Sequence, residues 1–426
     1  MTTYDEALAA IHGMPRLAKT GGHERIEALL AALGNPQHGR YVHVTGTNGK
    51  GSVANAIAHM LAAAGLEVGL YTSPFIMRFN ERIQVSGHPI PDADLVAAYD
   101  AAAAALAKLQ AVRSDFAVTE FEFITALAFW YFAERGVDVA VIEVGIGGDT
   151  DSTNVIDPLV SVITSVGLDH AKLLGNTLTS VATHKAGIIK PGRPVVTAAL
   201  PTEAADVVAA RVAQTKSRWL TADTDFAASH ATLAGWGQRF DYRDADGRLP
   251  QLTIPLVGPY QVHNAAVAIQ AAKLAAKALG VPLSAAAIRR GLAESTWPAR
   301  MERLSQEPLI VIDGAHNPQG VRSLVAALNQ VFGRQPLTLI VGVLADKDVR
   351  TMLNLLEQTR FRLWLVPVPD NPRATVAADY PADARLRVFA DWQTALGAHL
   401  AEYPDEPVVI AGSLYLASAV RQTLLA

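Results

Sequence analysis

Short apolar runs alternate along the chain with longer stretches whose apolar residues recur at helical spacing. Near-continuous runs rich in valine and isoleucine are typical of strands that are buried on both faces of a parallel sheet. In the first half of the chain these runs are YVHVTG, EVGLYTS, VDVAVIEVG, LVSVITSVG and RPVVTAA, with helical stretches such as FITALAFWYFAERG between them. The alternation predicts an α/β domain whose parallel sheet carries helices on both faces.

The pattern changes between about residues 215 and 257, where short polar and apolar segments are broken by Asp-Gly and Gly turns. We expect a small antiparallel excursion there. An alanine-rich helix should then end at Gly280, a shorter one should begin at Ser284, and the proline of TWPARMERL marks a probable boundary. We therefore place a first domain at 1–297 and a second at 298–426.

The second domain repeats the α/β pattern on a smaller scale. Its strands are predicted at PLIVIDGAH, LTLIVGVLADKD, FRLWLVPVP and PVVIAGSLYL, with helices near 319–331, 350–360, 391–402 and 414–425. The fold class is therefore α/β: a parallel-sheet domain with a small antiparallel excursion, followed by a smaller Rossmann-like C-terminal domain.

Residues 42–61, VHVTGTNGKGSVANAIAHML, run from a β-branched strand through a glycine-rich turn into a helix. This is the build of a phosphate-binding loop. Gly46, Gly49 and Gly51 allow backbone amides to turn inward, and the positive end of the helix faces the anion. An ordinary glycine-rich turn is the alternative.

Lys50 and Ser52 favour the phosphate-binding interpretation. Lys50 can place its charge on β- and γ-phosphate oxygens, and Ser52 can offer a hydroxyl to Mg²⁺. The spacing departs from GxxxxGK[ST], because Val44 stands where the first glycine would be and Gly51 separates Lys50 from Ser52. We therefore predict a variant loop that binds a nucleoside triphosphate.

Composition narrows the possible ligands. The chain of 426 residues has no cysteine, so a metal would need oxygen or imidazole ligands, which suits a hard cation such as Mg²⁺. The formal charge of −4 and the lack of a polybasic block argue against a nucleic-acid partner. We find no apolar run that approaches the roughly 18 residues of a spanning helix. The expectation is a soluble, cytoplasmic protein that has no membrane partner and binds small molecules.

Ligands of parallel sheets collect beyond the carboxyl ends of the strands. Ser73 follows EVGLYT, Glu143 closes VDVAVI, and His170 lies just past LVSVITSVGLD. An acid at the end of an apolar strand, beside a phosphate loop, commonly holds the Mg²⁺ of a nucleotide, so Glu143 is the first candidate metal ligand. Ser73 alone could merely cap a helix, and His170 alone could be a structural histidine.

Two further groups have more than one interpretation. Lys185 lies among small and apolar residues in THKAGIIKPG, where an ammonium would be costly unless it were paired or chemically changed. A surface lysine is the alternative. In VIDGAHNPQG, Asp313 and His316 could contact nucleotide or orient a nucleophile, or the turn could simply need Asp, Gly and Asn for backbone reasons.

Taken together, the motifs make the chain resemble the folylpolyglutamate synthase family of Mur-ligase-like, ATP-dependent amide ligases. The resemblance covers nearly the whole chain, and its matching blocks are HVTGTNGKGS, YTSPFIMRFNERI, VIEVGIGGDTDSTNV, GLDHAKLLG, HKAGIIKPG, LVGPYQVHNAAVAI, WPARMERL, VIDGAHNP, LADKD and AGSLYLASAV. Several ordered blocks are more specific than any single loop.

The resemblance implies a reaction and its substrates. ATP would phosphorylate the γ-carboxylate of a reduced folate's glutamate tail, and the amine of L-glutamate would attack the acyl phosphate. Phosphorylation is needed because a carboxylate is a poor electrophile until one oxygen becomes a good leaving group. Two Mg²⁺ ions would offset the repulsion between the anionic substrates, and domain closure would assemble the site.

The resemblance also implies roles for individual residues. ATP would contact Thr47, Asn48, Gly49, Lys50, Gly51, Ser52, Asn264, Arg300 and Asp313, and the catalytic residues would be Lys50, Lys185, Asp313 and His316. The metal ligands would be Ser73, Glu143, His170 and Lys185, with Lys185 N-carbamylated; the substrate contacts would be Phe75, Arg82 and Ser413.

Departures from the motifs common among relatives leave alternatives open. They fall at Phe75, Asp149, His184, Tyr260 and Ala299. We favour glutamate extension alone, in a monomer; the alternative is an enzyme that also adds the first glutamate to dihydropteroate. A cell-wall amide ligase is less favoured because only 45 residues precede Gly46. A nucleotide-driven switch protein is disfavoured because we find no NKxD-type guanine-reading segment.

Overall fold

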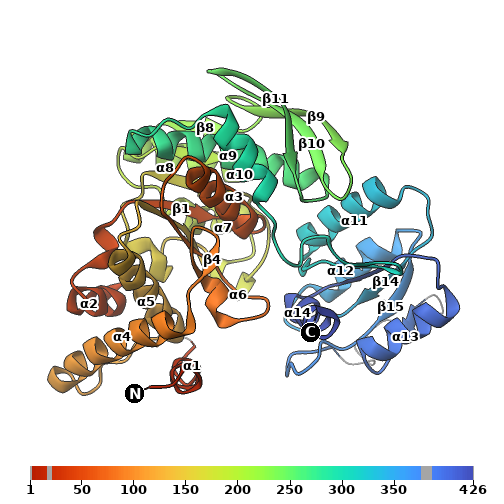
Figure 1. Cartoon of the computed structure of the whole chain (residues 1–426), viewed down its shortest axis with the longest axis horizontal. Coiled ribbons are helices and arrows are strands. Elements are labelled where there is room, and N and C mark those ends of the chain that lie inside the picture. The colour runs from red at the N-terminus through yellow and green to blue at the C-terminus, as the bar shows by residue number, and fades with distance from the viewer. Residues whose placement is uncertain (1, 17–21, 376–385, 426) are drawn as a thin grey trace. The chain divides into compact units, whose positions relative to one another are not determined.

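A computed structural model describes residues 2–16, 22–375 and 386–425. Contacts divide the chain into two compact units, coloured mainly red to green and green to blue in Figure 1. Unit 1 comprises Met1–Ala228, Tyr242–Leu249 and His263–Ser295, and unit 2 comprises Ser229–Asp241, Pro250–Val262 and Thr296–Ala426. The predicted division after residue 297 lies close to Thr296, where the last segment of unit 2 begins, and two earlier segments of the chain also belong to unit 2.

Unit 1 is built on an eight-stranded sheet in the order β4-β3-β2-β5-β1-β6-β7-β8. Its strands are β1 (Tyr41–Thr45), β2 (Val68–Tyr71), β3 (Ile83–Val85), β4 (His88–Pro89), β5 (Val139–Glu143), β6 (Val160–Ile163), β7 (Val195–Thr197) and β8 (Trp219–Thr221). The six strands from β2 to β8 are parallel, as the apolar runs predicted. The edge strands β3 and β4 pair antiparallel, which the apolar pattern did not predict.

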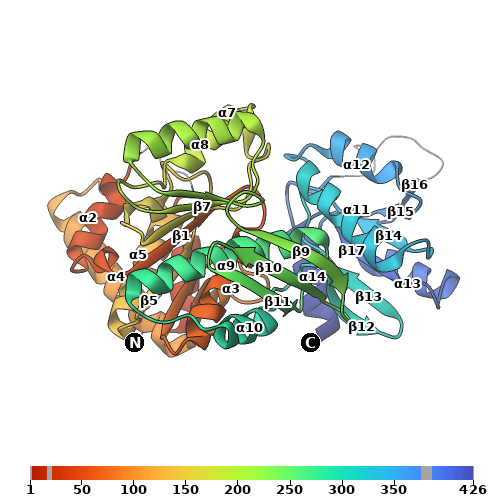
Figure 2. The ribbon, with the colours of Figure 1, turned by 90° about the horizontal axis from the view of Figure 1, so that it is seen from above.

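Helices cover both faces of this sheet, and Figure 2 shows α7 and α8 side by side next to β7. The helices of this part of the chain are α1 (Tyr4–His12), α2 (Glu24–Ala32), α3 (Lys50–Ala63), α4 (Asp92–Val112), α5 (Glu120–Arg135), α6 (Ala171–Leu174), α7 (Leu178–Ala186), α8 (Thr202–Thr215), α9 (Pro259–Leu279) and α10 (Ala285–Glu294). Short 3₁₀ turns lie at Pro36–His38, Phe79–Arg82 and Ser152–Val155. Apolar side chains of α1, α2, α4 and α5 share one core with Tyr41, Tyr71 and Ile142 of the sheet, whereas α3 packs on β1, β2 and β5 and carries α10.

The helix α4 needs a separate remark because it is long and apolar enough, by length and composition alone, to cross a membrane. This corrects the expectation that no segment approaches that criterion. The apolar character comes largely from alanines, and Leu95, Ala98, Ala102 and Ala105 are buried in the core that α4 shares with α5. These four residues form the packed side of α4, and 22% of its most apolar 18-residue stretch is buried.

The predicted antiparallel excursion is a three-stranded sheet of β9 (Ala227–Leu233), β10 (Gln238–Asp244) and β11 (Gly247–Ile254), in the order β11-β10-β9. Residues 234–237 and 245–246 connect these strands, and connections this short join antiparallel neighbours. The excursion begins later than residue 215, because β8 belongs to the large sheet.

Unit 2 contains a six-stranded sheet in the order β12-β13-β17-β14-β15-β16. Its strands are β12 (Glu302–Gln306), β13 (Leu309–Ile312), β14 (Thr338–Val341), β15 (Arg362–Leu365), β16 (Leu386–Val388) and β17 (Val408–Ala411), and its helices are α11 (Pro318–Phe332), α12 (Val349–Glu357), α13 (Trp392–Glu402) and α14 (Leu414–Leu425). Only β12, among these strands, pairs antiparallel. The α/β class predicted for both parts of the chain is confirmed.

Candidate functional site

Four neighbouring strands of unit 1 end at one edge of the sheet. They are β2, β5, β1 and β6, in that spatial order, and all four run parallel. Ser73 follows β2, Glu143 is the last residue of β5, residues 46–52 follow β1, and residues 164–170 follow β6. The chain therefore collects these predicted site segments at the position where parallel sheets hold ligands.

The turn after β1 is fixed by hydrogen bonds to the end of β6. Thr47 N donates to Ser165 O at 3.0 Å, and Asn48 N donates to Ser165 Oγ at 2.9 Å. The Thr164 hydroxyl donates to Asn48 O at 2.6 Å, and the Thr47 hydroxyl donates to Gly167 O at 2.9 Å. These bonds, made with residues outside the loop, fix its backbone. The direction of the amides at the start of α3 therefore does not depend on hydrogen bonds within the loop.

Two glycines of this turn are required by close contacts. A Cβ on Gly46 would collide with the Thr164 hydroxyl. Gly49 has φ +85°, and a Cβ there would lie 2.7 Å from Asn264 Oδ1. The structure thus brings Asn264 of α9 to the loop, although more than two hundred residues separate them in sequence.

Lys50 and Ser52 lie in the first turn of α3, which contains no acidic residue. Ser52 is buried and Lys50 and Gly51 are half-buried. Free amides, a lysine and the positive end of the helix dipole all favour an anion at this point. The arrangement is that of a phosphate cradle, whereas a plain turn would need neither the lysine nor the buried serine.

Glu143 places a carboxylate beside this cradle. Its side chain is 4% exposed, and its Oε2 accepts a hydrogen bond from Ser73 N at 3.1 Å. Ser73 caps no helix, so that alternative is wrong. A buried carboxylate is costly unless a cation or donors compensate it, which makes Glu143 suitable for a hard cation.

The remaining predicted metal ligands, His170 and Lys185, differ in their exposure to solvent. His170 is exposed and adopts the left-handed conformation, φ 51°, just before the short helix α6. Nowhere in the described ranges do three His, Asp, Glu or Cys side chains gather as a ready-made metal site. An ion here would depend on phosphate oxygens and water as well as on protein, as Mg²⁺ commonly does.

Lys185 is buried, at 2% exposure, in the last turn of α7, so the surface-lysine alternative is wrong. Burial, followed by the positive charge of Lys50, lowers its pKa to about 7; Asp169 and Asp151 act in the opposite direction. The electrostatic influence of Lys50 places the two lysines in one site. Burial and the neighbouring charge thus favour the neutral amine of Lys185 over its ammonium form.

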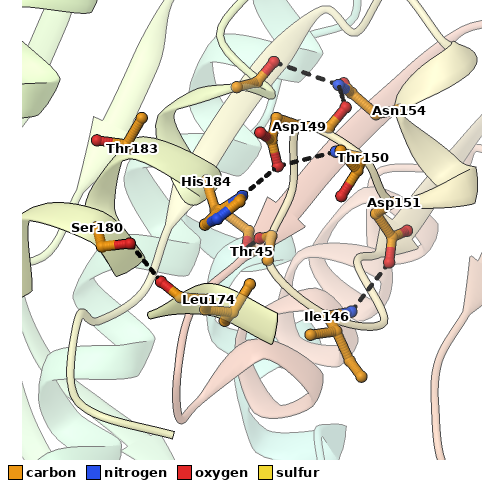
Figure 3. A network of polar contacts seen from close by, with 12 residues as sticks. Thr45, Ile146, Asp149, Thr150, Asp151, Asn154, Leu174, Ser180, Thr183 and His184 are labelled. Carbon is orange, nitrogen blue, oxygen red and sulfur yellow. Dashed lines mark hydrogen bonds and ion pairs between the residues drawn. The ribbon is translucent and has the colours of Figure 1, made fainter. Parts of the chain in front are cut away.

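A polar network surrounds the end of α7 (Figure 3). Asp149 Oδ1 lies 2.7 Å from His184 Nδ1, and Asp149 N donates to His184 O at 2.8 Å. Asp151 is buried; burial raises its pKa, while hydrogen bonds from Thr153 and from the Ile146 amide oppose that shift. Asn154 Nδ2 donates to Asp149 O at 3.0 Å. These hydrogen bonds join the loop after Glu143 to α7 and also join the beginning of the loop to its end.

The segment after Ser73 forms a compact aromatic and cationic cluster. The Arg82 guanidinium lies 5.3 Å from the Phe75 ring centroid and 5.6 Å from that of Phe79, within cation–π range. Glu81 accepts hydrogen bonds from the amides of Ile76, Met77 and Arg78 and so holds the loop. The fold thus places the Phe75 ring next to the Arg82 guanidinium at the end of β2. This arrangement suits the binding of an aromatic ring.

Arg300, Asp313, His316 and Ser413 belong to unit 2 and are described within it. Asp313 is buried at the end of β13 and accepts from Met301 N at 2.9 Å and Ala315 N at 2.8 Å. Burial raises its pKa, and the Arg300 charge opposes that shift. Ala299 and Met301 both have positive φ on either side of Arg300. Two such non-glycine residues indicate a strained, over-determined loop, which is common at functional sites.

The other two residues of unit 2 make local bonds. His316 Nδ1 lies 2.9 Å from Gly314 O, and a proton on Nδ1 makes this contact a hydrogen bond because a carbonyl oxygen can only accept. Ser413 is buried after β17, and its hydroxyl accepts from Tyr415 N at 3.1 Å. The Asp313 carboxylate accepts hydrogen bonds from two backbone amides, as expected if the turn needs Asp for backbone reasons. This structural role is compatible with a second role at the site.

Sequence reasoning missed several polar residues around the loop: Thr164, Ser165, Asp151, Asp169 and the Asp149–His184 pair. Thr164 and Ser165 could have been found by their place directly after an apolar strand. The pairing of Asp149 with His184 joins distant segments and leaves no local signal.

Comparison with known proteins covers the whole chain. Residues 44–272 match the Mur ligase middle domain, and residues 299–414 match the glutamate ligase domain of Mur ligases. The folylpolyglutamate synthase of Lacticaseibacillus casei is 62% identical over 423 residues, which are 99% of each chain. A dihydrofolate synthase/folylpolyglutamate synthase of Bacillus subtilis (strain 168) is 36% identical over 99% of each chain. A solved structure described as an FPGS-AMPPCP-folate complex superposes with a TM-score of 0.93, at 61% identity and full coverage of both chains.

Proposed function

The chain belongs to the folylpolyglutamate synthases of the Mur ligase family, and we propose that it is an ATP-dependent ligase that adds L-glutamate to reduced folates by γ-amide linkage. The observation that carries the proposal is the phosphate cradle after β1 beside buried Lys185 and Glu143. A phosphate site with a neutral amine and a buried carboxylate suits phosphoryl transfer to a carboxylate. A relative crystallised with AMPPCP and folate supports both substrate classes.

The reaction proceeds through an acyl phosphate. The γ-phosphoryl group leaves ATP, its new bond forms to a carboxylate oxygen of the folate tail, and ADP departs. The glutamate amine then attacks the activated carbonyl carbon and loses a proton, and phosphate leaves. Thr47, Asn48, Gly49, Lys50, Gly51 and Ser52 cradle the phosphates, and Lys50 neutralises charge that develops on the transferred group.

Magnesium ions, which we propose number two, fit the donors at this edge. Buried Glu143, the Ser73 hydroxyl and His170 would hold them together with phosphate oxygens. When bound, Mg²⁺ supplies charge neutralisation between triphosphate and carboxylate. The chain's own contribution is to keep Glu143 oriented through the Ser73 amide.

We propose that Lys185 is N-carbamylated. A carbamate forms when a neutral amine attacks CO₂ and releases a proton, and the pKa of Lys185, lowered to about 7 by burial and by Lys50, provides that amine. Carbamylation replaces a poorly solvated cation with an anion able to hold metal. It also removes the repulsion between Lys185 and Lys50.

The substrates define the remaining roles. Phe75 and Arg82 form the folate side, with the aromatic ring and guanidinium available to the pterin and its carboxylates. Asn264 in unit 1, and Arg300, Asp313 and His316 in unit 2, contact ATP. Asp313 and His316 are also catalytic, and Ser413 binds the incoming glutamate. The part up to residue 297 is the ATPase domain, and the part from 298 supplies contacts to ATP and glutamate.

We propose glutamate extension alone as the activity. The alternative, an enzyme that also adds the first glutamate to dihydropteroate, is supported by the bifunctional name of the Bacillus subtilis relative at 36% identity. The relative at 62% identity carries the single name. We further propose that the protein works as a monomer in the cytoplasm, without a membrane.

The test is ADP release by the purified protein with Mg-ATP and L-glutamate, offered dihydropteroate, tetrahydrofolate or 5,10-methylenetetrahydrofolate. Product masses are read in parallel. Glutamate-dependent turnover with the folates alone is the expected result. Turnover with dihydropteroate would establish the bifunctional alternative, and no turnover with any pterin would refute the proposed substrate class. Lys50→Ala is the control for adventitious ATPase.

A further inference from the structure

The loop after Glu143 meets the last turn of α7 through a side-chain pair. Asp149 Oδ1 lies 2.7 Å from His184 Nδ1 (Figure 3). His184 directly precedes Lys185 in the sequence. The Asp149 amide donates to His184 O at 2.8 Å. One residue of the loop therefore holds both the side chain and the backbone of the residue that precedes Lys185.

The backbones approach as closely as glycine permits. A Cβ on Gly148 would lie 2.7 Å from His184 O and 3.2 Å from Lys185 Cα, and a Cβ on Gly187 would collide with Asp149. Any displacement of the loop is thus transmitted to the backbone of Lys185. Asn154 adds a third link, since its Nδ2 donates to Asp149 O at 3.0 Å and to Gly187 O at 3.3 Å.

The same loop begins at Glu143. Its other end is fixed by Asp151, whose Oδ2 accepts from Ile146 N at 2.9 Å and whose Oδ1 accepts from the Thr153 hydroxyl at 2.6 Å. The loop is consequently a short, braced connection between Glu143 and Lys185.

Val181, Ala182 and Ala186 of α7 pack into a buried core, and the polar contacts of Asp149 and Asn154 add to that packing at the end of the helix. A cavity of about 820 Å³ borders Thr183, Ala186 and Gly187. The Asp149 and His184 side chains are 37% and 27% exposed, and ion pairs with such exposure add little to stability. The contact should therefore matter for the position of Lys185 more than for the stability of the fold.

We propose that Asp149 and His184 are positioning residues whose contact sets Lys185 against Glu143 and the phosphate cradle. The inference rests on the proposed role of Lys185 in phosphoryl transfer. It assigns a function to a pair that acts through the backbone of α7.

The test is a charge-reversal cycle with Asp149→Arg, His184→Glu and the double variant. Misplacement of a catalytic group commonly costs about tenfold to a hundredfold in rate, so each single change should lower kcat by about that factor. The KM for ATP and the urea midpoint should stay close to the unmodified protein. The double variant restores an oppositely directed pair and should recover most of the lost kcat.

Two further variants keep the test decisive if a reversed charge impairs folding. His184→Asn retains a donor near the Nδ1 position and should keep kcat, whereas His184→Ala should lose it. Asp157→Arg is the matched control, because Asp157 forms an exposed ion pair with Arg193 that does not touch α7 or the loop after Glu143. Unchanged kcat in the single variants, or a double variant no better than the product of the singles, would overturn the inference.

Carbon-13 NMR after exposure to labelled bicarbonate separates this inference from the proposed function. A carbamate signal in the unmodified protein that weakens in Asp149→Arg supports both. Rescue in the double variant without any carbamate signal supports positioning and refutes carbamylation. A carbamate signal with strictly additive kcat losses refutes positioning and leaves the proposed function in place.

Discussion

Replacement of Lys185 by methionine should abolish turnover and at the same time stabilise the protein. Lys185 is almost completely buried, and its pKa is lowered from 10.5 to about 7, first by burial and then by Lys50. Methionine keeps a similar unbranched chain without the charge. The change therefore removes the cost of burying an ammonium and also removes the group proposed to carry the carbamate.

The size of the stabilisation depends on pH, and its sign follows from linkage. Between pH 7 and 10.5 the unfolded chain binds more protons at Lys185 than the folded one, so the unmodified protein gains stability as pH rises. Below pH 7 the full penalty of the charged side chain is present. The advantage of Lys185→Met should then be about 5 kcal/mol at pH 6 and about 2 kcal/mol at pH 9, at 1.36 kcal/mol per pKa unit.

The assay is urea unfolding followed by far-UV circular dichroism, in CO₂-depleted buffer without nucleotide, at pH 6 and pH 9. Lys185→Ala is the comparison for loss of packing, since it removes the charge but leaves a cavity. An advantage that does not change between the two pH values would refute the assigned pKa. A methionine variant that is less stable at both values would refute the burial of a cation at this position.

Three more predictions concern single residues. Lys50→Ala should reduce ATP-dependent turnover to less than about a hundredth of that of the unmodified protein, because it removes the charge in the phosphate cradle. Its circular dichroism should stay unchanged, and normal turnover would exclude a role of Lys50 in phosphate binding. Gly46→Ala should abolish binding of a fluorescent ATP analogue, because its Cβ would collide with the Thr164 hydroxyl, and intact binding would show that the loop adapts. Gly397→Ala, in α13 with no atom near the new Cβ, should raise the free energy of unfolding by about 0.5–1 kcal/mol in urea titrations; a decrease would contradict the helix assignment.

The parallel sheets were predictable because strands buried on both faces need continuous apolar runs, and such runs stand out in sequence. The phosphate cradle was predictable for the same local reason, since strand, glycine turn and helix follow one another within residues 42–61. The antiparallel strands β3, β4 and β12 were not, because β3 and β4 are short and all three are partly exposed. Their pairing depends on the partner strand, so no local period marks it.

Side-chain environments were harder to predict than elements. The sequence left Lys185 open between a surface and a buried position, and only the packing of α7 decides it. Its pKa depends on Lys50, which lies on another helix. Asp149 and His184 are 35 positions apart, and only the turn of the loop after β5 brings them together. No local sequence pattern predicts contacts between residues that lie so far apart in the chain.

Lys50 and Lys185 show why the order of events proposed for this site follows from charge. Lys50 lies at the start of α3, and its positive charge contributes to the lowered pKa of Lys185. Bound triphosphate would bring negative charge to the same place and would favour the ammonium form of Lys185. Since only a neutral amine attacks CO₂, the carbamylation proposed for Lys185 would have to precede ATP binding.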